Sequence, residues 1–263
     1  MEDKIYVAWQ DEVSRSWHTI ACLKRDTTGY ELIFTQGATK LDEVSKKLFQ
    51  LKPGNIYRFN DLIPVFKNKI PPKSRPDFDK MAAWLGVEKS AGEFELLKAF
   101  GLVPSSDSTL TYPAPKIDQG QYRLRFFVHG IRHRHPEAVK ETEGLAEGQR
   151  LLPLLDVQNP VDPNAVALQS ASGLIVGYVP AFYAADLKKL LTMASVASEA
   201  RIFVKRNNQD SPIQIRLLCE FTAPAPSGFR VLDSESHRPL LSKAATPSLR
   251  IAPLAYHSNV TLF

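Results

Sequence analysis

Short β-strand candidates crowd the second half of the chain, and they constrain its fold more than any other feature of the sequence. Six apolar segments with β-branched or alternating character occur there, at residues 122–128, 148–156, 165–169, 174–179, 200–204 and 213–221. One helix candidate, at residues 181–193, interrupts them. Many short strands around a single helix favour a small β-barrel over a doubly wound sheet.

The first half of the chain predicts an antiparallel sheet accompanied by helices. Strand candidates lie at residues 5–9, 17–25 and 30–34, with a turn at 27–29 between the last two. Helical spacing of apolar residues follows at 41–48, 77–85 and 93–100. The whole chain is therefore expected to be α+β and mostly β.

Composition places a boundary between the two halves. Residues 102–119 contain three prolines, several serines and threonines and no sustained periodicity, which is typical of a linker. We therefore divide the chain into a domain at 1–105, a linker at 106–120, a second domain at 121–222 and a tail at 223–263. Five prolines punctuate that tail, which predicts a partly extended segment.

The positive charge of the chain is unevenly distributed. A net charge of +5 over 263 residues is mild and does not by itself require a polyanionic partner. Residues 121–136, however, contain four arginines, three of the six histidines and no acid. Such a patch can attract phosphates, or it can be the basic solvent face of a strand, and the sequence alone leaves both readings open.

Membrane segments, secretory signals and disulfides are not indicated. No apolar run approaches the about 20 residues that a bilayer requires. The opening residues MEDKIYVAW lack the basic and apolar regions of a secretory signal, so we expect a cytoplasmic protein. Cys22 and Cys219 lie almost a chain length apart and form no CxxC motif, which predicts buried free thiols.

Catalytic and metal-binding patterns are weak. His129, His133 and His135 could bind a metal, but no cysteine or carboxylate stands at a matching ligand spacing, so solvated or stacking histidines are favoured. GxSxG, HExxH and clustered DxD patterns are absent, which argues against a nuclease or another hydrolase. We therefore expect a protein without catalytic residues, metal or cofactor.

Three stretches of the second half together resemble the HIRAN domain. They are FVHGIRH at 127–133, LLPLLDVQNPVDPNAVALQ at 151–169 and GLIVGYVPAFYAADLKKLL at 173–191. Their order and spacing agree with the family pattern over about residues 121–222. The resemblance implies an OB-like, six-stranded barrel with one main helix, whose groove takes single-stranded DNA and checks for a free 3′-hydroxyl.

The resemblance and the chemistry of single strands together select the candidate DNA-binding residues. Cationic groups hold phosphates and flat side chains stack on bases. The candidates are Arg132 and Arg134 for phosphates, His133, Tyr178 and Phe182 for bases, and Asn159 and Asp162 for the terminal nucleotide. An ionised Asp162 can accept a hydrogen bond from a free hydroxyl, whereas a phosphate at that place would set two anions together.

Structural roles for the same residues stand beside these assignments. Asn159 and Asp162 belong to an Asn-Pro and Asp-Pro turn, where such side chains commonly brace their own backbone. Tyr178 and Phe182 could equally pack in the core. A DNA-binding member of the family has aromatic side chains where this chain has Val161 and His133, which predicts weaker stacking.

Residues 56–101 resemble the N-terminal subdomain of HipA-type toxin kinases. The similarity lies in Phe66-x-Asn68-x-Ile70-Pro71 with Arg75 following, in Leu85-Gly86-Val87, and in Phe94-x-Leu96-Leu97 before Phe100-Gly101. A glycine-rich phosphate loop, a catalytic loop and a Mg²⁺-binding acid motif are missing, which excludes a kinase. The resemblance implies that residues 1–105 dock on a partner protein such as a HipA-like chain.

Two functions follow from these patterns. The leading hypothesis is a protein that binds single-stranded DNA or DNA 3′ ends, carries a protein-interaction domain, and works in a toxin-antitoxin or phage-defence setting. The alternative is an antitoxin-like or defence-complex subunit that binds a kinase-like partner and no DNA.

Overall fold

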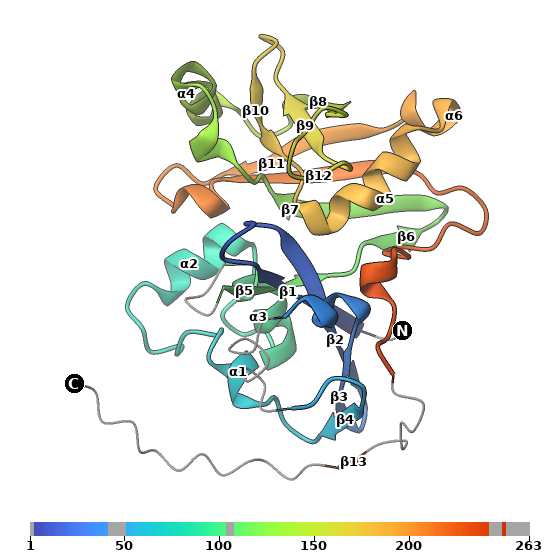
Figure 1. The fold of residues 1–263 in the computed structure, drawn as a ribbon. Helices are drawn as coiled ribbons and strands as arrows, with labels where there is room; N and C mark the ends of the chain where they lie inside the picture. The colour runs from blue at the N-terminus through green and yellow to red at the C-terminus, as the bar shows by residue number, and fades with distance from the viewer. Residues whose placement is uncertain (1–2, 42–50, 104–107, 242–248, 251–263) are drawn as a thin grey trace.

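The computed structural model describes residues 3–41, 51–103, 108–241 and 249–250, and these form two sheets packed one above the other (Figure 1). The sheets are antiparallel apart from one short parallel pair, and few helices accompany them. No helix in the described ranges is long and apolar enough to cross a membrane.

The first sheet has the strand order β13-β4-β3-β2-β1-β5. Its strands are β1 (Asp3–Gln10), β2 (Trp17–Asp26), β3 (Gly29–Phe34), β4 (Ile56–Phe59), β5 (Thr109–Pro113) and β13 (Leu249–Arg250). The antiparallel meander expected for the first 34 residues is thus confirmed.

Helices cover one face of this sheet. They are α1 (Pro64–Lys67), α2 (Phe78–Leu85) and α3 (Glu93–Phe100). From α3, Phe94 and Leu97 belong to the same buried cluster as Val7 and Leu23, while Phe100 contacts Phe78 of α2. Two of the expected helices are confirmed, and the one expected at 41–48 lies almost wholly outside the described residues.

The second sheet has the strand order β10-β9-β8-β11-β12-β7-β6. Its strands are β6 (Lys116–Asp118), β7 (Gln121–Phe127), β8 (Arg150–Leu155), β9 (Val166–Gln169), β10 (Ile175–Tyr178), β11 (Arg201–Asn207) and β12 (Leu217–Pro224). The helices beside it are α4 (Pro136–Gly144), α5 (Ala181–Leu191) and α6 (Ala194–Ala197). The main helix expected near 181–193 is therefore present, and α4 is an addition that the sequence reading missed.

The described strands do not form the closed six-stranded barrel that the sequence led us to expect. A closed barrel needs a continuous ladder between the first and last strands. Here β7 ends at Phe127 and β10 spans only four residues before Pro180 begins α5, so a single bridge between His129 and Tyr178 connects them. The second sheet is open, with β6 as an additional edge strand.

The two halves share one hydrophobic core. Tyr6 and Tyr112 of the first sheet belong to the same buried cluster as Leu124 and Phe182 of the second half, and the Tyr112 and Phe182 rings stack with centroids 4.1 Å apart. The segment that we expected to be a linker contributes β5 to the first sheet and β6 to the second. Pro113 ends β5, whose apolar residues are buried, so this part of the segment is packed structure and not a flexible connection.

The described part of the C-terminal segment packs against both halves. Leu232 is buried and donates its backbone N–H to Asp186 of α5, at 2.8 Å. His237 is buried against Tyr112 of the first sheet. The described residues up to Leu241 therefore pack against both halves, where the prolines predicted a partly extended tail.

Both cysteines are buried free thiols, as expected. Cys22 of β2 and Cys219 of β12 lie inside the shared core. Burial raises the pKa of the Cys219 thiol well above its usual range, so this thiol stays protonated.

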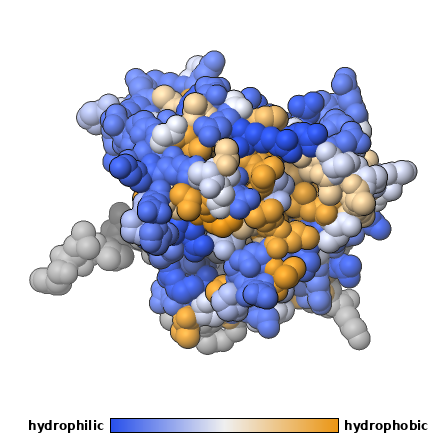
Figure 2. All heavy atoms as spheres, turned by 90° about the horizontal axis from the view of Figure 1, so that it is seen from above, coloured by the Kyte–Doolittle hydropathy of each residue, from blue (hydrophilic) through white to orange (hydrophobic). Residues whose placement is uncertain are grey.

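One face of the second sheet is open to solvent and partly apolar. Figure 2, which looks down on this half of the molecule, shows apolar side chains gathered near its middle. Leu152 and Leu154 of β8 and Phe203 of β11 are large apolar residues exposed there, whereas their neighbours Leu151 and Ile202 are fully buried. The strands thus alternate between core and solvent, as expected for an antiparallel sheet.

Candidate nucleic-acid interface

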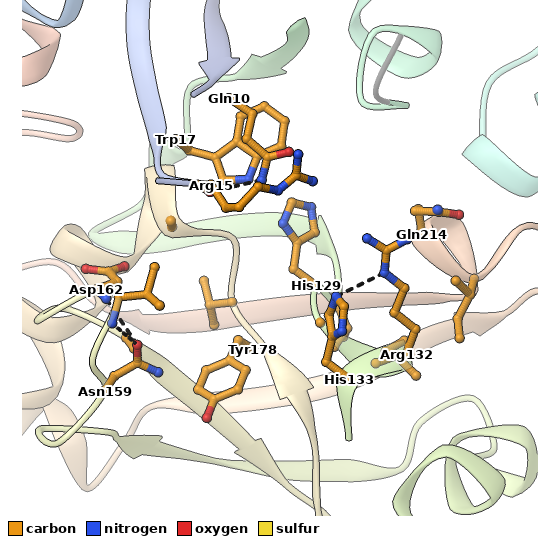
Figure 3. A pocket seen from close by; sticks show the side chains of 18 residues that line it. Gln10, Arg15, Trp17, His129, Arg132, His133, Asn159, Asp162, Tyr178 and Gln214 are labelled. Carbon is orange, nitrogen blue, oxygen red and sulfur yellow. Dashed lines mark hydrogen bonds between the residues drawn. The ribbon is translucent and has the colours of Figure 1, made fainter. Parts of the chain in front are cut away.

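A pocket of about 460 Å³ lies between the β1–β2 hairpin and the second sheet (Figure 3). Five of the seven residues proposed from the sequence line it: Arg132, His133, Asn159, Asp162 and Tyr178. These residues are up to 46 positions apart in the sequence, from Arg132 to Tyr178. The fold therefore brings the three sequence stretches together around one opening.

The turn after β7 presents the basic side chains. Gly130 has a φ of 75°, in the left-handed region that glycine tolerates, and it starts a short 3₁₀ turn at Ile131–His133. Ile131 is buried and anchors the turn. Arg132 and His133 are exposed, and Nε of Arg132 donates a hydrogen bond to Nε2 of His133 at 3.0 Å. The pair offers a guanidinium and a flat ring side by side.

The Asn-Pro turn builds the other end of the pocket. Oδ1 of Asn159 accepts hydrogen bonds from the backbone N–H groups of Val161 and Asp162, at 3.0 and 3.1 Å. Oδ1 of Asp162 accepts one from the N–H of Asn164 at 2.8 Å. Both side chains therefore brace their own turn, so the structural role considered for them is real. Asn159 has little remaining capacity to contact a nucleotide.

Asp162 remains the acidic group of the pocket. Burial raises the pKa of its carboxyl above the ordinary value, although the hydrogen bond from Asn164 and the charge of Lys188 oppose that shift. Figure 3 shows Asp162 and Arg132 on opposite sides of the opening, with Tyr178 between them. The pocket thus has an anionic end and a cationic end separated by an aromatic ring.

Tyr178 is held in place by a carboxylate that sequence reasoning missed. Oδ2 of Asp156 accepts hydrogen bonds from the Tyr178 hydroxyl, at 2.9 Å, and from Nδ2 of Asn159, at 3.0 Å. The guanidinium of Arg134 lies 4.9 Å from the centre of the Tyr178 ring. Arg134 therefore packs on the Tyr178 ring and does not line the pocket itself. Asp156 follows β8 directly. The only sequence signal for its role is an acidic residue at the end of an otherwise apolar stretch.

Phe182 does not line the pocket that Arg132, Asp162 and Tyr178 share. Its ring is buried and packs against Tyr112, Tyr183 and Trp17. It belongs to the core that joins the two halves, because α5 turns this position inward. Phe182 contributes only to a neighbouring pocket of about 270 Å³, so it does not join the other candidates around the opening that Arg132 lines.

Residues 121–224 match the HIRAN domain family. HIRAN domains bind DNA, which supports a general role in nucleic-acid binding for this part of the chain. The match covers the second sheet apart from β6, together with α4, α5 and α6, and includes every residue proposed from the sequence for the pocket.

Two solved structures are similar to part of the chain. The HIRAN domain of human HLTF is 18% identical, with 40% of this chain and 78% of that chain covered and a TM-score of 0.32. A protein from Lactobacillus plantarum is 17% identical, with 40% of this chain and 97% of that chain covered and a TM-score of 0.33. Among curated proteins, no relative was found at a significant level of similarity. None of these comparisons confirms the resemblance of residues 56–101 to HipA-type kinases, which stays a prediction.

The first half of the chain adds residues to the HIRAN pocket that sequence reasoning did not anticipate. Gln10, Arg15 and Trp17, from the β1–β2 hairpin, line it opposite Asp162 and Tyr178. More than 100 residues separate this hairpin from the HIRAN motifs, and no local pattern connects them. The hairpin reaches the pocket because the two halves pack on one shared core.

The histidines considered as metal ligands are dispersed by the fold. His129 lies partly buried in the pocket, and burial lowers its pKa to about 4, so it is neutral near pH 7. His135 lies at the start of α4, beside Glu137. Within the described ranges, no group of three or more histidine, cysteine or acidic side chains could hold a metal ion.

Proposed function

We propose that this chain binds single-stranded DNA in the pocket between Arg132 and Asp162, prefers a free 3′-hydroxyl, and performs no chemistry on it. The observation that carries the proposal is the arrangement of a guanidinium, an aromatic ring and a carboxylate around one opening of a HIRAN domain. A single strand offers a phosphate, a base and a terminal sugar in the same order.

The cationic end and the ring suit any single strand. Arg132 is exposed and can neutralise a phosphate, while His133 and Tyr178 offer flat surfaces to bases. Stacking of this kind is tolerant of sequence, because every base has a π-face. We therefore expect little preference among DNA sequences.

Selection of an end requires a group that distinguishes the tip of a strand from its middle. Asp162 can accept a hydrogen bond from a free 3′-hydroxyl, whereas a further phosphate would bring a second anion beside it. The partial burial that raises the Asp162 pKa also strengthens this repulsion, because less water screens the two charges.

Fluorescence anisotropy with a short labelled strand tests the proposal. A strand that ends in a 3′-hydroxyl should bind more tightly than the same strand with a 3′-phosphate. Binding of both should weaken as salt rises, because binding releases counterions from the strand and added salt lowers the entropy gained by that release. Equal binding of the two strands would remove the end preference but leave single-strand binding. Absence of binding to both strands at low salt would contradict the proposed function.

Co-purification and an oligonucleotide column test the alternative function. If residues 1–105 instead dock on a kinase-like partner in a toxin-antitoxin or defence complex, the chain should co-purify with that partner and pass an oligonucleotide column unretained. The basic and aromatic lining of the pocket favours the DNA-binding proposal.

A further inference from the structure

The β1–β2 hairpin is rigidly built where it faces the HIRAN domain. Oδ1 of Asp11 accepts hydrogen bonds from the N–H groups of Val13 and Ser14, at 3.0 and 2.6 Å. The backbone of Asp11 bonds to that of Ser16, and Nε2 of Gln10 donates to the carbonyl of Arg15 at 3.0 Å. The loop therefore has a defined shape, which a binding surface requires.

The backbone of Arg15 is held in an unusual conformation. Its φ is 59°, in the left-handed region that only glycine, asparagine and aspartate adopt readily. Its N–H donates to the carbonyl of Asp11 at 2.9 Å, which closes the loop. Arg15 is exposed, and Figure 3 shows its guanidinium above His129, on the wall formed with Gln10 and Trp17, while Arg132 reaches the pocket from beside His133. Two cations from different halves of the chain thus line the same pocket.

Trp17 lies where two pockets meet. It lines the pocket that contains Arg132 and also a neighbouring pocket of about 270 Å³, which includes Asn164 and Ser234. Arg15, Val161 and Asp162 line both pockets as well. The hairpin and the Asn-Pro turn therefore face each other across a constriction, with an indole on one side and a small valine on the other.

The partly buried Trp17 ring is supported by aromatic neighbours. Its centroid lies 6.3 Å from that of Phe182, edge to face, and 6.5 Å from that of His129. These contacts fix the ring from the core side, while its position in the lining of both pockets leaves surface for a ligand. Indole is a large, rigid surface for base stacking.

We propose that the β1–β2 hairpin is the second wall of the nucleic-acid site, where Trp17 stacks on an unpaired base and Arg15 holds a phosphate together with Arg132. This inference rests on the proposed function and assigns part of the site to the first half of the chain. Val161 leaves the turn without an aromatic side chain, and Trp17 supplies one from the opposite side. A base held at this constriction must be unpaired, so duplex DNA without a frayed end is excluded.

Tryptophan fluorescence gives a direct test. The chain contains three tryptophans, of which Trp9 is buried and Trp84 lies outside both pockets. The probe is a hexathymidylate with a 3′-hydroxyl, titrated into the full chain. We expect it to quench the emission of the natural protein, and Trp17→Phe to abolish this quenching while it retains most of the affinity, because phenylalanine still stacks.

Two further variants separate the aromatic and cationic contributions. Trp17→Ala should weaken hexathymidylate binding by about 5- to 150-fold, the range for loss of one stacked base. Arg15→Asn removes the charge, and asparagine tolerates the left-handed backbone, so the loop keeps its shape. This variant should lower the magnitude of the log-log salt slope by about 0.7. Val13→Ala is the matched control, since Val13 is 94% exposed in the same hairpin and lines neither pocket.

The outcomes distinguish this inference from the proposed function. If the natural protein binds hexathymidylate but the quenching persists in Trp17→Phe and Trp17→Ala binds normally, the hairpin is not part of the site and the proposed function stands. If the natural protein does not bind hexathymidylate at low salt, both are overturned. Thermal unfolding of each variant identifies any loss of binding that comes from loss of the fold.

Discussion

His129 and Tyr178 exchange both of their backbone hydrogen bonds, each 2.9 Å long. This pair is where the residues that follow β7 meet β10, the opposite edge strand of the second sheet. It fixes the basic turn at residues 130–133 beside the Tyr178 ring. The geometry of the pocket therefore depends on how closely these two backbone segments approach.

Gly177 permits that approach, and a larger residue there should weaken both the fold and the site. A Cβ atom at this position would clash with a side-chain atom of Val128 and lie 2.7 Å from the carbonyl oxygen of His129. We expect Gly177→Ala to destabilise the protein by about 1–3 kcal/mol, the usual cost of overpacking. Urea unfolding measures this. Gly144→Ala is the control, since a Cβ there meets nothing within 4 Å.

Arg132→Ala should weaken binding to all single strands equally. The lost guanidinium contacts a phosphate, which every strand and both kinds of 3′ end possess. We expect the magnitude of the log-log salt slope to fall by about 0.7, because one phosphate is no longer neutralised. Anisotropy over a series of salt concentrations measures the slope. Arg123→Ala removes the same charge from an exposed position on β7 outside the pocket and should change the slope little.

Asp162→Asn should mainly erase the preference for a 3′-hydroxyl. The amide oxygen can still accept the hydrogen bond from the Asn164 N–H, so the turn is preserved. The lost charge removes the repulsion from a terminal phosphate, and we expect the preference to fall by about ten- to a hundredfold. Competition between the two strands gives the ratio. Asp118→Asn, on the exposed strand β6, is the control because it makes the same change of charge. If Asp162→Asn left the ratio of the two affinities unaltered, end recognition would lie elsewhere.

The local features of this fold were readable from the sequence, whereas contacts between distant segments were not. Alternating apolar residues predicted the first meander, and apolar residues at helical spacing predicted the helices at Phe78–Leu85 and Glu93–Phe100, because periodicity reports which face is buried. The HIRAN motifs predicted five residues of one pocket. The burial of Phe182 depends on Tyr112, 70 positions away, and no periodicity encodes that pairing.

The packed segment at 109–118 and the open second sheet differ from the predicted linker and closed barrel because both depend on pairing between distant strands. Proline and serine at residues 102–119 resemble a linker in composition, but β5 gains its stability from pairing with β1, whose partner residues lie 100–108 positions earlier. Closure of a barrel depends on strand length and stagger, which short apolar runs do not specify. Sequence patterns thus identified the pieces of the site, and tertiary pairing determined which of them meet.

Asp156 should act as a positioning residue for Tyr178. Asp156→Ala removes the acceptor shared by the Tyr178 hydroxyl and Asn159, which frees both the ring and the turn. We expect weaker strand binding and a loss of about 1 kcal/mol of stability, the typical net worth of a hydrogen bond. Asp156→Asn keeps an acceptor oxygen and should restore most of the affinity. A purely electrostatic role would instead make the two variants equally defective, and anisotropy distinguishes these results.

His237 should make the protein less stable below neutral pH. Its ring is buried, with Nε2 2.8 Å from the Tyr112 hydroxyl and Nδ1 2.6 Å from the Ser234 hydroxyl. Burial lowers its pKa to about 4, and the nearby charges of Lys4 and Lys189 act in the same direction. The folded state therefore binds fewer protons than the unfolded state between pH 4 and 6.5, so stability falls as pH falls through this window.

The size of this effect can be isolated from that of the other titrating groups. A shift from 6.5 to about 4 corresponds to roughly 2 kcal/mol of stability lost between pH 7 and pH 5. Urea unfolding at the two pH values measures the loss. His237→Gln can still bond to Tyr112 and Ser234 but does not titrate, so its loss over the same interval should be smaller by about that amount. An equal loss in both proteins would mean that His237 is protonated without unfolding, and that the segment around it releases from the shared core at pH 5.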